Sequence, residues 1–131
     1  MGTKDIEQVL ITACAGLGIV PLSSIYVADD YPEGIDGERM VIRVKEQQRN
    51  PVFYTGFVEV NAVVPDVDGR ADHTRLQEVE NTLAEAFRYD TVTEFNGETC
   101  RYGLHSIRTL YEQDAKYHYA NARLLFEILN I

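Results

Sequence analysis

Tryptophan is absent from the 131-residue chain, cysteine occurs only twice, and no hydrophobic run approaches the length that spans a membrane. Cys14 and Cys100 stand in unlike contexts, without a CxxC pair or a histidine at ligand spacing. We therefore expect two small buried thiols in a reducing compartment, with a disulfide as the alternative. The chain also has no internal repeat, no glycine-rich phosphate loop and no nucleophile elbow, so no motif in it indicates nucleotide binding or nucleophilic catalysis.

Basic residues are scarce as well. The chain has 12 Lys and Arg against 21 Asp and Glu, which gives a formal net charge of -9. Because binding to a phosphate backbone needs clustered cations, we expect no specific nucleic acid partner. The first residues do not combine a basic segment with an apolar one, so we also expect a soluble protein that is not secreted by the usual route and has no membrane partner. The length and a hydrophobic content of 45% predict a single domain over residues 1–131.

The clearest pattern runs from residue 51 to residue 90, where a strand is followed by an acidic turn and a helix. Apolar residues at every second position predict one buried strand face, and Pro65 ends the pattern. Apolar residues at three-to-four spacing then predict an amphipathic helix. We expect the two apolar surfaces to bury each other. The strand residues are Val58, Val60, Ala62 and Val64, and the helix residues are Leu76, Val79, Leu83 and Phe87.

The first third of the chain predicts one helix and two strands. Apolar residues from Ile6 to Leu17 recur at helical spacing, with Thr3 or Asp5 as the cap. A short edge strand is expected over residues 25–27. A second strand begins at Arg39, turns over residues 47–50 and pairs with the central strand as a long hairpin.

The last third predicts a second long hairpin. Residues 88–98 are interpreted as a connection that contains a turn at Asn96-Gly97. Alternation then predicts a strand in which Cys100, Tyr102, Leu104 and Ser106 share one face, a turn over residues 112–114 and a final strand over residues 117–128. The predicted fold class is α+β: a mixed, mainly antiparallel sheet of four to five strands with two helices packed on one face.

Two acidic segments raise the question of a metal site. The segment Asp29–Glu38, called the acidic loop below, holds five acids but matches no metal-binding spacing. The segment Asp66–Asp72 lacks the later glutamate that a calcium loop needs, and its acids suit the start of a helix capped by Asp72 or Thr74. We therefore predict a solvated loop, a helix cap, and neither a metal nor a cofactor.

Cations are concentrated on the strand that begins at Arg39. Arg43 and Lys45 alternate with apolar residues, and Arg49 extends the basic run. Edge strands often carry cations that prevent aggregation, which is one interpretation. The other is that a basic strip on an acidic protein is one half of a charge-complementary subunit contact, which the acids of Asp29–Glu38 and of Asp66–Asp72, Asp66 and Asp68 among them, complete. The sequence favours neither.

Catalysis is not expected, because no histidine stands near a recognisable nucleophile. His73 beside Asp72 is interpreted as a surface residue of the first helical turn, and His118 as a satisfied core or interface histidine. A small enzyme would need a convergent cluster of acids, bases and nucleophiles, and the sequence shows none.

The layout resembles the tail-terminator and tail-completion (head-tail joining) proteins of long-tailed bacteriophages. The resemblance rests on three segments: FVEVNAVV at Phe57–Val64, ADHTRLQEVENTLAEAF at Ala71–Phe87 and YHYANARLLFEI at Tyr117–Ile128. It implies a structural subunit of a homo-oligomeric ring that closes the tail tube beneath the head, with tail tube and head-tail connector proteins as partners. It also implies a place in the virion, or in the host cytoplasm when the protein is expressed from a prophage. The alternative function is a small acidic monomeric binding or immunity-type regulatory module.

Overall fold

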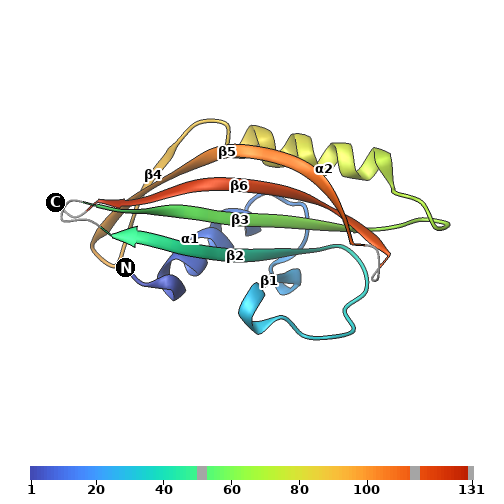
Figure 1. The fold of residues 1–131 in the computed structure, drawn as a ribbon, viewed down its shortest axis with the longest axis horizontal. Coiled ribbons are helices and arrows are strands. Elements are labelled where there is room, and N and C mark those ends of the chain that lie inside the picture. Colours follow the sequence, from blue (N-terminus) through green and yellow to red (C-terminus); the bar gives the residue numbers. More distant parts are fainter. Residues whose placement is uncertain (50–52, 113–115, 130–131) are drawn as a thin grey trace.

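The structure is a computed structural model that describes residues 1–49, 53–112 and 116–129. It has an α+β fold, a mixed sheet of six strands with two α-helices (Figure 1). The helices are α1 (Thr3–Ala15) and α2 (His73–Ala86), with short 3-10 turns η1 (Leu22–Ser24) and η2 (Ala28–Asp30). The strands are β1 (Ile25–Val27), β2 (Arg39–Arg49), β3 (Phe53–Pro65), β4 (Thr91–Phe95), β5 (Glu98–Glu112) and β6 (Tyr117–Leu129).

The strands follow the order β1-β2-β3-β6-β5-β4. β1 runs parallel to β2, and every other pair is antiparallel. The two predicted hairpins, β2–β3 and β5–β6, therefore lie side by side and are joined through β3 and β6 (Figure 1). The short strand over residues 25–27 is confirmed, and it stands at one edge of the sheet.

The sheet has one strand more than the four to five predicted, because residues 91–95 form β4 instead of part of a connection. The Asn96-Gly97 turn was identified correctly, with both residues at positive φ, 51° and 81°. It closes a hairpin between β4 and β5. The β4 strand is short and lies at the edge, and its residues alternate only between half-buried and exposed, so its hydrophobic signal is weak.

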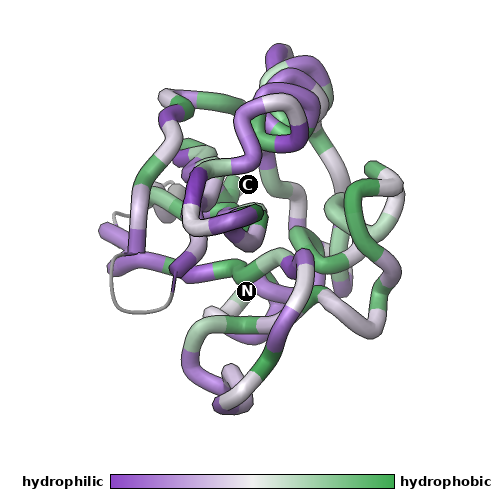
Figure 2. Tube along the Cα trace, turned by 90° about the vertical axis from the view of Figure 1, so that its right-hand side faces the viewer, coloured by the Kyte–Doolittle hydropathy of each residue, from purple (hydrophilic) through white to green (hydrophobic). Residues whose placement is uncertain are grey.

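Both helices cover the same face of the sheet. α1 packs on β1 and β2, whereas α2 packs on β3, β5 and β6. The predicted contact is confirmed: the strand face over residues 58–64 and the helix stripe over residues 76–87 are buried in one core. Figure 2 shows α2 at the top of the molecule with hydrophilic and hydrophobic segments alternating along its turns, as an amphipathic helix requires.

The helix caps differ in detail from those predicted. Gly2 is the N-cap of α1, and the Asp5 carboxylate accepts a hydrogen bond from the Gly2 N–H at 3.0 Å, so neither Thr3 nor Asp5 occupies the cap position itself. Asp72 caps α2 as expected, because its side chain accepts from the Arg75 N–H at 3.2 Å. Thr74 lies inside that helix and is not its cap.

Two β-bulges interrupt the regular alternation. One lies between Val44 and Gln47 in β2, and the other between Leu104 and Ser106 in β5. Beyond the second bulge Ser106 pairs with Arg123 on the uncovered face, so the prediction that it shares a face with Cys100 is wrong. An extra residue shifts the two-residue period by one, which reverses the face of every later side chain in the strand.

Two predicted turns lie wholly or partly outside the described residues. β2 continues through Gln47 to Arg49, so the hairpin does not turn there, and residues 50–52 are not described. Likewise, Glu112 belongs to β5, and residues 113–115 are not described. Within the described ranges, no helix is both long and apolar enough to cross a membrane.

Candidate subunit interface

Within the described residues, no helix and no second sheet covers the face of the sheet opposite the helices, and we call it the open face; Ala28 and Tyr31 reach over its end at the start of β2. Register assigns its residues, because side chains opposite one another on neighbouring strands point to the same side. Its charged and amide residues come from five strands. They are Arg39, Arg43, Lys45 and Gln48 of β2, Glu59 and Asn61 of β3, Glu94 of β4, Arg101, Arg108 and Glu112 of β5, and Asn121, Arg123 and Glu127 of β6.

One row across the middle of the open face joins Arg43, Glu59 and Arg123 on adjacent strands. Glu59 also forms an ion pair with Lys45, whose ammonium lies 3.5 Å from the carboxylate. The guanidinium of Arg123 stacks over the ring of Phe57 at 4.0 Å. An arginine over an aromatic ring keeps hydrogen-bond donors available to a partner, so this row is equipped to bind anionic or amide groups.

The next row is centred on two asparagines. The Asn121 side-chain amide donates to the Asn61 carbonyl oxygen at 2.6 Å. Asn121 is only 8% exposed, so this bond satisfies a buried polar group. The pair aligns β3 and β6 at the centre of the open face.

The end of the open face near the start of β2 is aromatic. Arg39 is 6% exposed; it donates to the Tyr31 hydroxyl and to the Gly37 carbonyl, the latter at 2.8 Å. Its guanidinium also lies over the ring of Tyr117 at 5.0 Å. A cavity of about 170 Å³ opens beside these groups. It is lined by Ala28, Tyr31, Val41, Arg43, Asn61, Val63, Glu112, Tyr117 and Tyr119.

The chemistry of this cavity suits binding. Burial, and next the carboxylate of Glu112, raise the pKa of Tyr117, so its phenol keeps a proton that it can donate to a partner. Three tyrosines and an arginine line the cavity, and tyrosine and arginine, with tryptophan, are the residues most enriched at the hot spots of protein interfaces.

The bulge in β2 separates the cations that the sequence grouped together. Arg43 lies on the open face and Lys45 reaches Glu59 there, but Arg49 pairs with Tyr54, on the face that carries the helices. Its guanidinium stacks over the Tyr54 ring at 4.8 Å. The prediction that Arg49 continues the strand-face strip is therefore wrong, because the bulge at residues 45–46 shifts the period.

Asp66 and Asp68 lie near the end of β3 that is remote from Arg49. The Asp66 carboxylate is 2.7 Å from Nδ1 of His118, and its side chain is 7% exposed. Asp68 is exposed in the turn after β3, at a φ of 53°. Among the described residues, no ion pair joins either acid to Arg43, Lys45 or Arg49 within one chain.

Several residues of the open face were missed as site residues. Tyr117, Tyr119, Asn121 and Arg123 were visible in the sequence as the set that alternates with the buried residues of the last strand. That alternation is the signal that would have found them. Arg108 gave no such signal, because the bulge in β5 decides its face.

The histidines and cysteines lie in separate environments. The ring of His105 is 5.0 Å from Phe57, whereas His118 is bonded to Asp66 and stacks on Tyr111 at 4.5 Å. Both cysteines are free and buried as predicted, and burial raises the pKa of the Cys14 thiol to about 12. Among the described residues, no group of three or more His, Cys, Asp or Glu is arranged to hold a metal ion.

Comparison with solved structures shows that other proteins share this fold. Twelve chains of solved structures match significantly. One is a protein whose name describes no function; it shares 16% sequence identity and superposes with a TM-score of 0.64 over 98% of this chain and 93% of its own. At this identity the likeness shows a shared fold alone. No family model and no curated protein matches the sequence.

Proposed function

We propose that this chain is a structural subunit of a phage or prophage tail, similar to a tail terminator, that forms a homo-oligomeric ring capping the tail tube and joining it to the head. The observation that carries the proposal is the open face. Two long hairpins present arginines, tyrosines and amides over a broad surface that, within the described residues, no helix and no second sheet covers. Such a surface suits lateral assembly, because its side chains can contact a neighbouring subunit directly, without a cofactor between them.

The proposed role has consequences for partners and chemistry. The ring contacts tail tube and head-tail connector proteins in the virion, or in the host cytoplasm when the protein is expressed from a prophage. The subunit performs no catalysis in this role. The three histidines lie apart from one another: His73 at the start of α2, His105 on the open face and His118 on the helix-covered face.

The subunit contact joins opposite charges. We propose that Arg43, Lys45 and Arg49 of one subunit approach Asp66 and Asp68 of the next, since the cations extend from the middle of the β2–β3 hairpin to Arg49, whereas the two acids follow the other end of β3. The same contact repeated head to tail generates a ring when the rotation closes. Charged groups at a rim mainly set register and association rate, so apolar and backbone contacts must supply most of the affinity.

Size-exclusion chromatography with light scattering, together with negative-stain electron microscopy, tests the assembly. The expected result is a ring whose mass is a multiple of 14.9 kDa and which weakens at high ionic strength. Arg43→Glu with Lys45→Glu should shift it towards monomer, because both changes place new carboxylates beside Glu59. Arg88→Glu, on an exposed arginine after α2, is the control and should leave the mass unchanged. A wild type that stays monomeric at high concentration, with and without divalent ions, contradicts self-assembly.

A monomeric binding or immunity-type module is the second candidate function. It is favoured by the tyrosine-lined cavity of about 170 Å³, which accommodates a partner's side chain without any second copy. A monomeric wild type that retains its fold would support this function over the ring.

A further inference from the structure

The open face differs in charge from the rest of the chain. It carries six bases, Arg39, Arg43, Lys45, Arg101, Arg108 and Arg123, against four acids, Glu59, Glu94, Glu112 and Glu127. The whole chain has 12 bases and 21 acids. The rest of the chain is acidic, so any second copy of the same chain offers an acidic surface that is complementary to this basic face.

Three arginines of the open face have no carboxylate partner within the described residues. Arg43, Arg108 and Arg123 are all exposed and form no ion pair with any described acid. Arg101, by contrast, is bonded to Glu127 at 3.0 Å. Arg123 faces Arg43 across Glu59, and Arg108 stands in the next row opposite Asn121. The three guanidiniums therefore lie in two neighbouring rows near the centre of the face.

The acidic loop is the matching surface. Its acids Asp30, Glu33 and Asp36 are exposed and, within the part of the chain that the structure describes, form no ion pair. The loop contains no base.

The loop is held at both ends. Arg39 bonds its Tyr31 and Gly37, and Arg75 bonds its last residue, Glu38, at 2.8 Å. These anchors position the backbone of the loop and leave the three unpaired carboxylates exposed.

We propose that the open face binds the acidic loop of a second copy, with Arg43, Arg108 and Arg123 engaging Asp30, Glu33 and Asp36. This inference rests on the proposed ring and gives its subunit contact a different acidic side: Arg43 meets the acidic loop in place of Asp66 and Asp68, and Arg49 takes no part. The acidic loop connects the edge strand β1 to β2, so it lies at the side of the sheet (Figure 1). A contact between a broad face and a side edge is heterologous and turns the direction of growth at each step, as closure into a ring requires.

A charge exchange tests the pairing directly. The face variant carries Arg43→Glu and Arg123→Glu, and the loop variant carries Glu33→Lys and Asp36→Lys. Alone, each places like charges at both sides of the contact and should sediment at the monomer mass of 14.9 kDa. Mixed in equal amounts, the two variants should recover the wild-type mass, because an altered face then meets an altered loop and a native face meets a native loop.

The outcomes separate the inference from the proposed function. Recovery of the wild-type mass only in the mixture supports the inference. The control variant carries Arg70→Glu and Arg88→Glu. It changes the net charge as much as the face variant does and should assemble like wild type. Assembly of the face variant or the loop variant alone overturns the inference. If assembly is instead lost on Arg49→Glu or Asp68→Lys, the ring stands and its contact is the one between the hairpin cations and Asp68. A wild type that is monomeric under all conditions overturns both.

Discussion

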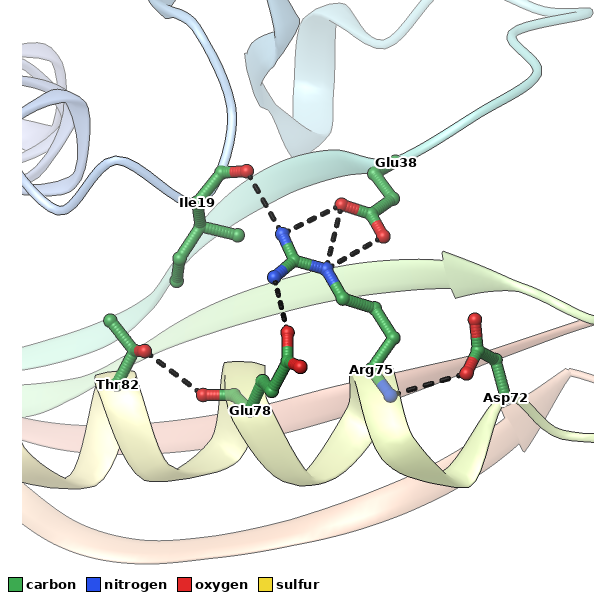
Figure 3. A network of polar contacts seen from close by, with 6 residues as sticks. All are labelled: Ile19, Glu38, Asp72, Arg75, Glu78 and Thr82. Carbon is green, nitrogen blue, oxygen red and sulfur yellow. Dashed lines mark hydrogen bonds and ion pairs between the residues drawn. The ribbon is translucent and has the colours of Figure 1, made fainter.

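Arg75 links three separate parts of the fold, and replacing it gives a direct measure of that link. Its guanidinium donates to both carboxylate oxygens of Glu38, at 2.8 Å, to Glu78 at 3.1 Å and to the Ile19 carbonyl at 3.2 Å (Figure 3). α2 is thereby tied to the segment after α1 and to the end of the acidic loop. The Glu38 and Arg75 side chains are 32% and 29% exposed, so the pair is partly shielded from water.

We expect Arg75→Ala to lower the free energy of unfolding by about 2 kcal/mol, since hydrogen bonds to charged groups contribute about 1.5 to 3 kcal/mol and partial exposure reduces that value. For a chain of this length, that change lowers Tm by about 7 °C. A double-mutant cycle with Glu38→Gln should give a coupling energy of about 1 kcal/mol that decreases in high salt. Urea unfolding followed by circular dichroism measures all four proteins.

Two comparisons make this prediction specific. Arg75→Lys keeps the charge but cannot form the two parallel bonds to Glu38, so it should lose about half as much stability as Arg75→Ala. Arg88→Ala removes an exposed arginine 3.9 Å from Glu85, and it should change stability by less than about 0.5 kcal/mol. A coupling energy between Arg75 and Glu38 below about 0.3 kcal/mol would refute the argument that this contact positions the loop.

Three further substitutions test the packing. Leu83→Ala should cost about 2 to 5 kcal/mol in thermal or urea unfolding, because Leu83 is fully buried between α2 and the sheet; an unchanged melt would contradict that packing. Gly56→Ala should cost about 1 to 3 kcal/mol, since the new methyl group would lie 2.6 Å from the Glu46 carbonyl oxygen, and equal stability would mean that the β2 bulge yields freely. The pKa of Cys14 rises from 9.0 to about 12 on folding. The contribution of its neutral thiol to the free energy of unfolding is therefore complete below pH 9 and is lost at about 1.4 kcal/mol per pH unit as the pH rises from 9 to 12. Cys14→Ala should therefore unfold with a flatter alkaline dependence, and parallel curves for the two proteins would exclude this linkage.

The regular elements could be predicted because their patterns are local. The alternation over residues 58–64 and the helical spacing over residues 76–87 place the same side chains in the core that the structure buries. β4 escaped prediction because an exposed edge strand of five residues needs little apolar surface. The strand count, six instead of four to five, results from that single element.

The candidate interface was predictable only in part. Arg43 and Lys45 could be assigned to one side of the sheet, because they precede or fall within the bulge. Arg49 could not, since the bulge at residues 45–46 reverses the face of the later residues of β2. Asp66 could be counted as an acid but not as a partner of His118, a residue 52 positions away.

The amino-acid sequence alone sets the period of each segment, and therefore which side chains leave water, because hydrophobic burial depends on spacing along a strand or helix. It also sets the acidic charge and shows that familiar catalytic motifs are absent. The tertiary structure is what joins the two hairpins through β3 and β6, and hence places Arg43 and Arg123 on either side of Glu59. Strand order and bulges produce this arrangement, since both depend on contacts between residues far apart in the chain, and the period of a single segment does not encode them.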